Sequence, residues 1–585
     1  MKKDGKFGKI NKKTLKGDDA MKKFSEMKFK KPNLAKIESD FNVIIDEFKN
    51  ATCFEEQDKA LRKMYKYADK LATNLNIGYV KYTCDTQDPV NVKNQELLDE
   101  MSPIISVYFD RFNRELVKAK FRKELEEKWG EHMFNMVQNA LDTFDEKIVP
   151  DLQEINKLTS EYTKLLASAQ IEFRGEIYNL SQLGKFATSS DRETRKEASL
   201  LSAKFFEEND QKIGEIYDKL VKARHNMALK LGYKNFIELG YKSLGRTDYT
   251  SKEVAGYREQ IYTDLVPFTN KLFKEQAKRI GVKNPQYYDY NIMFLSGNAT
   301  PKGDREYLVG KATEMYAELS KETHEFFEFM KEYELLDLEA RKGKAGGGYM
   351  TYFPDYKAPF IFSNFNGTSG DVDVLTHEFG HAFQGYMSRN ISCPDYRSPT
   401  LESCEIHSMS MEFIAHPWME LFFKEEADKY RYSHVADALT FIPYGATVDE
   451  FQHYVYENPE ATHEERCAKW REIEKKYLPH KKYKEAPVLE KGGWWMRQSH
   501  VFGSPFYYID YTLAQVVAFQ FFIESKKNHA KTWNKYVKLC KMGGKYPFTK
   551  LLEKARLNNP LNAGTVKKVV RPLKKYLDGF DTDKF

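Results

Sequence analysis

Two histidines one helical turn apart are the residues of this sequence best suited to hold a metal ion. His377 and His381 lie four positions apart, and Glu378 directly follows the first. Side chains at i and i+4 project from one face of a helix, so both imidazoles can reach the same cation. Glu378 then stands where it can accept a proton from a water molecule activated by the metal. The spacing therefore predicts a zinc site; the competing interpretation is a solvated helix with incidental histidines.

A catalytic zinc site needs a third protein ligand and an open position. Residues 398–412 have the pattern of a second helix and offer five candidates, which are Glu402, Cys404, Glu405, His407 and Glu412. A cysteine would be an unusual ligand in a hydrolytic site. Glu405 and Glu412 share a helix face, so one can bind the metal while the other hydrogen-bonds a ligand histidine. We expect Glu402 and His407 to serve helix packing or solvent contacts, but periodicity does not choose between Glu402 and Glu405.

A second group of polar aromatic residues lies between His500 and Tyr511. Tyr507 and Tyr511 are four residues apart, so their hydroxyls can project from one helix face. Hydroxyls aimed at an oxygen that gains negative charge during hydrolysis are each worth about 2.7–4 kcal/mol. Tyr508 is the reserve candidate. The alternative is simple packing, because the chain holds 37 tyrosines and most tyrosines bury the ring with the hydroxyl at a wet edge.

The segment before the paired histidines has the pattern of a small β-structure. Residues 349–353 and 358–365 resemble two short strands joined by a turn, and a glycine-rich loop precedes them. Asp371 is the predicted N-cap of the helix that carries the histidines, which we expect to run from Val372 to Arg389.

Helical periodicity dominates the rest of the chain. One apolar stripe comprises Leu34, Ile37, Phe41, Ile44 and Phe48, and a second comprises Leu152, Ile155, Leu158, Tyr162 and Leu165. The stretch from Asp191 to Gly232 is predicted to be one long helix that the glycine ends. These patterns predict a mainly α protein with a small sheet.

Charge and cysteine usage exclude several classes of protein. The net charge is +6 over 585 residues, but residues 1–33 carry +8, so the remainder sums to −2. A nearly neutral body argues against a nucleic-acid-binding surface, and residues 1–20 are predicted to be a flexible, Lys-rich leader. The chain lacks an apolar run of about 18 residues and a signal-peptide pattern. Six scattered cysteines indicate reduced thiols, so we expect a cytoplasmic protein with no membrane partner.

The two motifs together resemble a known family. His377-Glu-Phe-Gly-His381 followed by Glu405 is similar to the zinc metallopeptidases of the thimet oligopeptidase and oligoendopeptidase F family, whose pattern is HExGH with a glutamate on the next helix. Residues 346–349 and 364–368 resemble that family's approach to the zinc helix, and the likeness runs from about residue 21 to the C-terminus. Gln384 stands where many members have a further histidine, which favours the bacterial oligoendopeptidase F and Pz-peptidase-like branch.

The resemblance implies a role for each site residue. It selects Glu405 as the third ligand, so one zinc ion per chain would be held by His377, His381 and Glu405. It makes Glu378 the general base. Residues implied to contact the substrate or its transition state are His500, Tyr507 and Tyr511.

The resemblance also implies a fold and a function. We expect a multi-helical ellipsoid with a small β-sheet beside a zincin-type catalytic helix pair and a deep substrate channel, divided into an N-terminal helical region (21–190) and a catalytic region (191–585). The implied activity is endopeptidase cleavage of short, unstructured oligopeptides. The alternatives are a zinc exopeptidase of the carboxypeptidase or dipeptidase type, a non-catalytic peptide-binding protein and, least favoured, a scaffold that binds RNA through its Lys-rich leader. The sequence does not set the oligomeric state.

Overall fold

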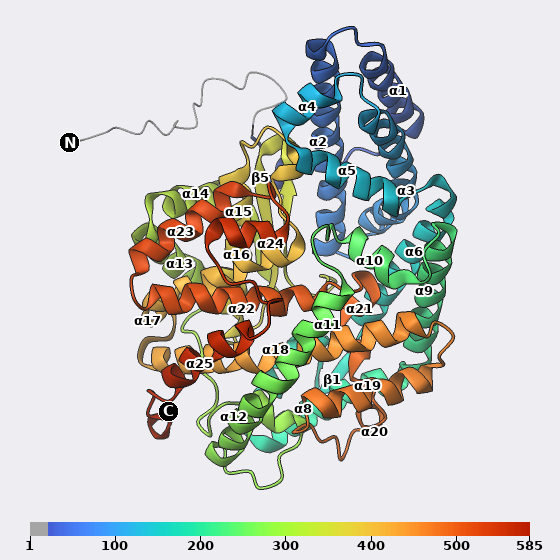
Figure 1. The fold of residues 1–585 in the computed structure, drawn as a ribbon. Coiled ribbons are helices and arrows are strands. Elements are labelled where there is room, and N and C mark those ends of the chain that lie inside the picture. The colour runs from blue at the N-terminus through green and yellow to red at the C-terminus, as the bar shows by residue number, and fades with distance from the viewer. Residues whose placement is uncertain (1–20) are drawn as a thin grey trace, which may run out of the picture.

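The computed structural model describes residues 21–585, so the predicted leader at 1–20 lies outside the described residues. The described chain is mainly helical (Figure 1), as predicted. Helices α1 (Leu34–Asn50), α2 (Phe54–Cys84) and α3 (Pro89–Val117) lie together with α4 and α5 around an apolar core of their own. The stripe predicted in α1 is confirmed, because Phe41, Phe48 and their neighbours on that face are buried in this core.

Most of the other helices surround a larger apolar core, whereas α4 and α5 belong to the smaller one. Their bounds are α4 Arg122–Trp129, α5 Glu131–Thr143, α6 Val149–Ala167, α7 Leu180–Ala187, α10 Phe236–Ser243, α11 Ser251–Gln260, α12 Val266–Arg279, α13 Arg305–Leu319, α14 Lys321–Glu332, α17 Met419–Phe423, α19 His463–Tyr477, α20 Pro487–Glu490, α21 Ser499–Gly503, α23 His529–Met542, α24 Phe548–Ala555 and α25 Thr565–Leu577. The second predicted stripe lies on α6, where Leu158 and Tyr162 are buried in the larger core. Within residues 21–585, the helices are too short or too polar to cross a membrane.

The prediction of one helix from Asp191 to Gly232 is wrong in its middle. The segment forms α8 (Arg192–Glu208) and α9 (Asp210–Lys230), separated at Asn209. The Asn209 side chain donates to the Phe205 carbonyl oxygen at 2.8 Å, and this local bond competes with continuation of the helix. The predicted end is confirmed. Gly232 has φ +88° and the Tyr233 N–H bonds back to the carbonyl of Ala228, as in a Schellman motif.

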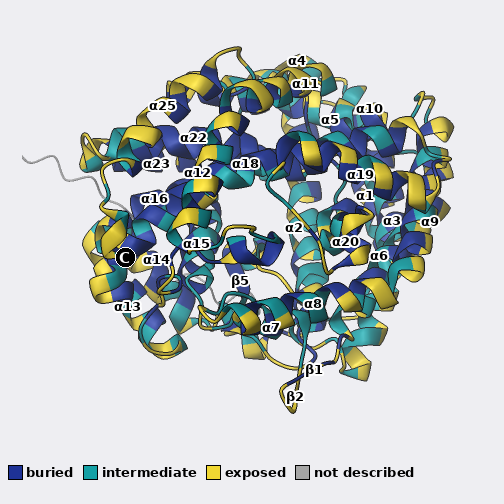
Figure 2. Ribbon diagram, turned by 90° about the horizontal axis from the view of Figure 1, so that it is seen from below, coloured by how far each residue is buried: buried dark blue, intermediate teal, exposed yellow. Residues whose placement is uncertain are grey.

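The two predicted strands are confirmed, and the sheet contains a third strand that the sequence did not reveal. Strands β4 (Tyr349–Phe353) and β5 (Ala358–Phe365) pair antiparallel, with Tyr349 opposite Phe362. Strand β3 (Leu336–Glu339) pairs parallel with β5, so the order is β3-β5-β4 and β4 is an edge strand. A separate hairpin of β1 (Ile171–Phe173) and β2 (Glu176–Tyr178) projects from the rim of the molecule (Figure 2).

The histidine helix, α15, runs from Gly370 to Ser388 and packs on β5. Asp371 is not its N-cap, so that prediction is wrong: Ser369 already has helical dihedral angles, and the helix begins before the aspartate. The Asp371 carboxylate instead accepts the backbone N–H groups of Asn366 and Gly367 at 2.9 and 2.8 Å. Asp371 therefore fixes the loop by which β5 enters α15.

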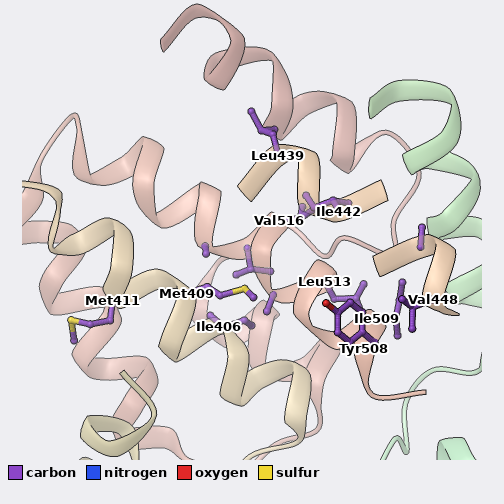
Figure 3. Close-up of a cluster of buried hydrophobic side chains, with 14 of the residues drawn as sticks. Ile406, Met409, Met411, Leu439, Ile442, Val448, Tyr508, Ile509, Leu513 and Val516 are labelled. Carbon is purple, nitrogen blue, oxygen red and sulfur yellow. The ribbon is translucent and has the colours of Figure 1, made fainter. Parts of the chain in front are cut away.

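Four helices meet at the centre of the molecule. Helix α16 (Leu401–Ile414) packs against both α15 and α22 (Tyr508–Ser525), and α18 (Ala427–Glu457) packs along α22. Figure 3 shows the apolar contact, in which Ile406 and Met409 of α16 lie beside Leu513 and Val516 of α22. This burial places the polar face of α16 between the histidines of α15 and the tyrosines at the start of α22.

Candidate active site

The predicted metal ligands converge on one point. The Nε2 atoms of His377 and His381 lie 3.2 and 3.4 Å from Oε2 of Glu405, and the ligand atoms of the three residues lie within 4.8 Å of one another. In a tetrahedral site with metal–ligand bonds of about 2.0–2.2 Å, two ligand atoms are about 3.3–3.6 Å apart. Two imidazole nitrogens and one carboxylate oxygen at this spacing fit zinc. The His377 and His381 side chains are 19% and 11% exposed, so the cluster is reachable from solvent.

A glycine in the histidine motif explains how the two helices approach so closely. A Cβ atom placed on Gly380 would lie 2.6 Å from the His407 carbonyl oxygen and 2.7 Å from Cα of Ser408. Both atoms belong to the backbone of α16, which cannot move aside without shifting the helix. Only glycine at this position lets α16 come near enough for Glu405 to reach the histidines.

Glu405 is held by partners of its own. Its Oε2 accepts the Ser408 hydroxyl at 2.9 Å, and its Oε1 accepts the Tyr507 hydroxyl. The residue is 2% exposed. A buried carboxylate costs free energy unless it is paired, and here hydroxyl donors and the adjacent imidazoles compensate for its burial.

A chain of buried polar groups extends behind His377. Its Nδ1 lies 2.7 Å from Oε1 of Glu412, whose Oε2 lies 2.8 Å from Nε2 of His434. Nδ1 of His434 in turn lies 2.8 Å from Nε2 of His416. The predicted pairing of Glu412 with a ligand histidine is therefore present. It occupies Nδ1 of His377 and leaves Nε2 to face the other ligands.

Glu378 lies beside the ligands with an uncommitted oxygen. Its Oε2 is buried and has no hydrogen-bond partner among residues 21–585, whereas its Oε1 lies close to Gly348, just before β4. Burial raises the pKa of Glu378, and the neighbouring His377 and His381 oppose that shift. A buried carboxyl of raised pKa with one free oxygen suits proton transfer near neutral pH.

The tyrosines and His500 form a second wall of the site, which the hydrogen bond from Tyr507 to Glu405 joins to the metal cluster. Tyr507 and Tyr511 have ring centroids 4.9 Å apart, and Nε2 of His500 lies 3.0 Å from the Tyr511 hydroxyl. Burial raises the pKa of both tyrosines well above the usual range, so their hydroxyls stay protonated. Burial also lowers the pKa of His500 to about 4, so this imidazole is neutral at physiological pH. Tyr508 packs its ring 5.1 Å from that of His500 and is 9% exposed.

The other candidates from 398–412 lie outside the metal cluster. Glu402 is 1% exposed and lies beside Arg246. This burial agrees with the expected role in helix packing and excludes the expected contact with solvent. His407 is fully buried, with Nδ1 3.5 Å from Cys540 Sγ. The Cys404 thiol is directed to the Pro399 carbonyl oxygen at 3.4 Å.

The structure adds residues that the sequence reasoning missed. His434 and His416 complete the chain behind Glu412, and Gln498 and Tyr444 complete a second chain behind His500. His434 and Tyr444 both belong to α18. No spacing rule signals them, because their positions depend on how α18 packs.

Two family models and several solved structures match this chain. Residues 24–144 match the Peptidase M3 N-terminal domain and residues 185–570 match Peptidase family M3. A solved structure titled PZ peptidase A with inhibitor 2 shares 50% identity and a TM-score of 0.95, covering 96% of this chain and 100% of that chain. A putative oligoendopeptidase F from Bacillus anthracis str. Ames shares 48% identity and a TM-score of 0.91, covering 97% and 100%.

A solved structure of much lower sequence identity shares the fold. Oligoendopeptidase-F from Enterococcus faecium is 14% identical with a TM-score of 0.61, covering 94% of this chain and 98% of that chain. This likeness concerns the fold alone. Among curated proteins, no match was found.

Proposed function

Because the chain belongs to peptidase family M3, in the branch of oligoendopeptidase F and Pz peptidase, and is a metallo-oligopeptidase, we propose that it is a zinc-dependent endopeptidase that cleaves short, unstructured peptides. The observation that carries the proposal is the convergence of His377, His381 and Glu405 beside a carboxylate with a free oxygen, Glu378.

The donor set supports zinc as the metal. His377, His381 and Glu405 would hold it through Nε2, Nε2 and Oε2, a set of two imidazoles and one carboxylate that is common in catalytic zinc sites. When bound, zinc supplies Lewis acidity that polarises a peptide carbonyl and acidifies water. Glu412 keeps Nδ1 of His377 engaged at 2.7 Å, which fixes the ring orientation for binding through Nε2.

Glu378 and the phenols perform the proton and charge chemistry. The free oxygen of Glu378 takes the proton of the attacking water and returns it to the departing amine. Tyr507 and Tyr511 are protonated hydroxyl donors on the second wall, suited to the carbonyl oxygen as it becomes negative. Tyr507 also bonds to Glu405, so Tyr511 is the better placed of the two for the substrate.

The edge strand β4 supports recognition of an extended peptide. The loop before it approaches Glu378, because a Cβ on Gly348 would lie 3.4 Å from Glu378 Oε1. At the far end, Asn76 of α2 donates to the Tyr352 carbonyl oxygen at 2.8 Å, so α2 covers the backbone edge there. Near Gly348, α2 contacts β4 through the Tyr349 side chain. A peptide backbone added to the end of β4 near Gly348 would run past Glu378. Backbone pairing of this kind selects extended chains largely regardless of side chain.

Peptide digestion with mass readout tests the class of reaction. We expect the zinc-loaded protein to cleave a short peptide with both ends blocked at an internal bond, and to leave a folded protein intact. Stepwise loss of terminal residues from an unblocked peptide, with the blocked peptide resistant, would instead identify an exopeptidase. Binding without cleavage would identify a peptide-binding protein.

Replacement of Glu378 by Gln tests the general base. The amide keeps the size of the side chain but cannot take the proton, so we expect kcat to fall about 10²–10⁴-fold with zinc still bound by metal analysis. Glu306→Gln on the exposed surface of α13 is the matched control. Full activity in zinc-loaded Glu378→Gln would exclude this role.

A further inference from the structure

Behind the Tyr511 hydroxyl lies a chain of three hydrogen bonds that ends in α18. The Tyr511 hydroxyl lies 3.0 Å from Nε2 of His500, and Nδ1 of His500 lies 2.8 Å from Nε2 of Gln498. Oε1 of Gln498 accepts the Tyr444 hydroxyl at 2.8 Å. Of these residues, only Tyr511 has a place in the proposed chemistry, so the three residues behind it need an explanation.

The hydrogen bond of Tyr444 determines which end of the Gln498 amide faces His500. Among residues 21–585, the Tyr444 hydroxyl has one hydrogen-bond partner, Oε1 of Gln498, to which it donates at 2.8 Å. This hydroxyl proton needs an acceptor, and the amide oxygen provides it. If the amide were turned over, two donors would meet and that proton would lose its acceptor. This arrangement directs the amide NH₂ group at His500.

The amide in turn selects one tautomer of His500. An amide NH₂ can only donate, so Nδ1 of His500 must carry a lone pair. A neutral imidazole without a proton on Nδ1 carries it on Nε2. That N–H donates to the Tyr511 oxygen, so the Tyr511 proton cannot point back at His500 and is directed elsewhere. A phenol that accepts one hydrogen bond is also a stronger donor in the next.

We propose that Gln498 is a positioning residue that holds His500 in its Nε2–H tautomer and thereby directs the Tyr511 proton toward the substrate carbonyl. This inference rests on the proposed function, which makes Tyr511 a donor to the substrate. The pKa of His500, which burial lowers to about 4, agrees with a neutral ring. The imidazolium form would place a second N–H against the amide NH₂ group, so the contact with Gln498 also disfavours it.

Nitrogen NMR of the zinc-loaded protein tests the tautomer directly. In protein labelled with ¹⁵N-histidine, the His500 signals are identified by their loss in His500→Gln. We expect the Nδ1 resonance at the position of an unprotonated ring nitrogen and the Nε2 resonance at that of a protonated one. A proton on Nδ1 in the unaltered protein would overturn the proposal, whatever any variant does.

Gln498→Glu tests the consequence for catalysis. The carboxylate accepts a hydrogen bond from an N–H on Nδ1, so His500 keeps a proton there: the ring is cationic at low pH and loses its Nε2 proton as the pH rises. The groups around His500 are Tyr507, Tyr508 and Tyr511, with the charge of Glu405 nearby. Relative to the unaltered enzyme, we expect kcat near normal at acidic pH and up to about 10²–10³-fold lower at alkaline pH, with KM little changed. Gln498→Met, of similar size, should cause a smaller loss that does not vary with pH.

A double variant separates failure of this inference from failure of the proposed function. If Gln498 acts through Tyr511, adding Gln498→Glu to Tyr511→Phe should bring no further alkaline loss. A pH-independent loss in Gln498→Glu, or an additive one in the double variant, would show a merely structural role and overturn the inference. Full activity of Tyr511→Phe would instead remove Tyr511 from the proposed function. Metal content and thermal unfolding are compared for every variant.

Discussion

The two walls of the candidate site are built by different physical means. On the metal side, Glu405, Glu412 and the histidines form a network of charged and titratable groups, in which each carboxylate oxygen has a partner. On the opposite side, Gln498, His500 and Tyr511 form a chain of neutral groups. A metal cluster needs negative charge in a fixed geometry, whereas transition-state donors need protons that burial retains. Burial therefore has two effects. It holds charged ligands in a fixed geometry on the metal side, and it keeps hydroxyl groups protonated on the other side.

Helix α18 supports both walls. His434 supports Glu412, and ten residues later Tyr444 supports Gln498. Positions that far apart on a helix are separated by about 15 Å, so one rigid element can serve the outer end of each chain. Tyr507 belongs to the metal side through its bond to Glu405. If the two sides are as independent as their chemistry indicates, changes in the metal network should alter metal retention, and changes in the chain of Gln498, His500 and Tyr511 should alter turnover alone.

The largest expected effect follows removal of the carboxylate ligand. Glu405→Gln replaces an anionic ligand by a neutral amide, so we expect zinc to be lost on dialysis. The rate of peptide hydrolysis should fall about 10³-fold or more, which corresponds to a loss of several kcal/mol of transition-state stabilisation. Glu402→Gln, another buried glutamate on α16, is the matched control and should keep its zinc. Zinc lost from Glu402→Gln and kept by Glu405→Gln would reverse the assignment.

The next largest effect is a difference between Tyr511 and Tyr507. Tyr511→Phe should lower kcat by about 10²–10³-fold with zinc retained, because one donor to the oxyanion is lost. Tyr507→Phe removes the hydroxyl bonded to Glu405 and should weaken zinc binding by about 10–100-fold. Zinc titration and steady-state kinetics on both variants measure the contrast. Equal effects on metal and turnover in the two variants would mean that the walls are not separate.

A smaller effect is expected at Glu412, which hydrogen-bonds the ligand His377 but is not itself a ligand. Glu412→Gln keeps the shape of the side chain but removes the charge between His377 and His434. We expect about 10–100-fold weaker zinc binding, and turnover close to normal once zinc is saturating. A kcat defect that excess zinc does not repair would place Glu412 in the chemistry rather than behind the ligand.

The sequence predicted the local parts of this site and missed the tertiary ones. The spacing of His377 and His381 predicts their convergence, because i and i+4 share a helix face. Glu405 was selected over Glu402 by family resemblance only; the structure separates them by placing Glu402 beside Arg246. His434 and Tyr444 could not be predicted, because their roles depend on the packing of α18.

The fold shows the same contrast between features set by local sequence and features set by tertiary contacts. Strands β4 and β5 could be predicted from their turn and composition, but β3 is four residues long and is defined by its parallel partner. The long helix predicted from Asp191 breaks at Asn209, where a side-chain bond to the backbone competes with the helix. Local rules fail where one side chain or a distant partner decides the outcome.

The smallest expected effect tests how the metal wall is assembled. Gly380→Ala places a Cβ against the backbone of α16 at His407 and Ser408. Overpacking of this kind costs about 1–3 kcal/mol of unfolding free energy, offset by up to about 1 kcal/mol from the better helix propensity of alanine. Urea unfolding of the metal-free protein measures the difference.

Gly385→Ala on the same helix is the matched control. A Cβ there meets the Tyr352 ring at 3.6 Å, an ordinary contact, so this variant should be unchanged or slightly more stable. Because Gly380→Ala pushes α16 away from α15, it should also separate Glu405 from the histidines and weaken zinc binding, whereas Gly385→Ala should not. If both variants bound zinc equally well, the close approach of the two helices at Gly380 would not be what brings the third ligand into place.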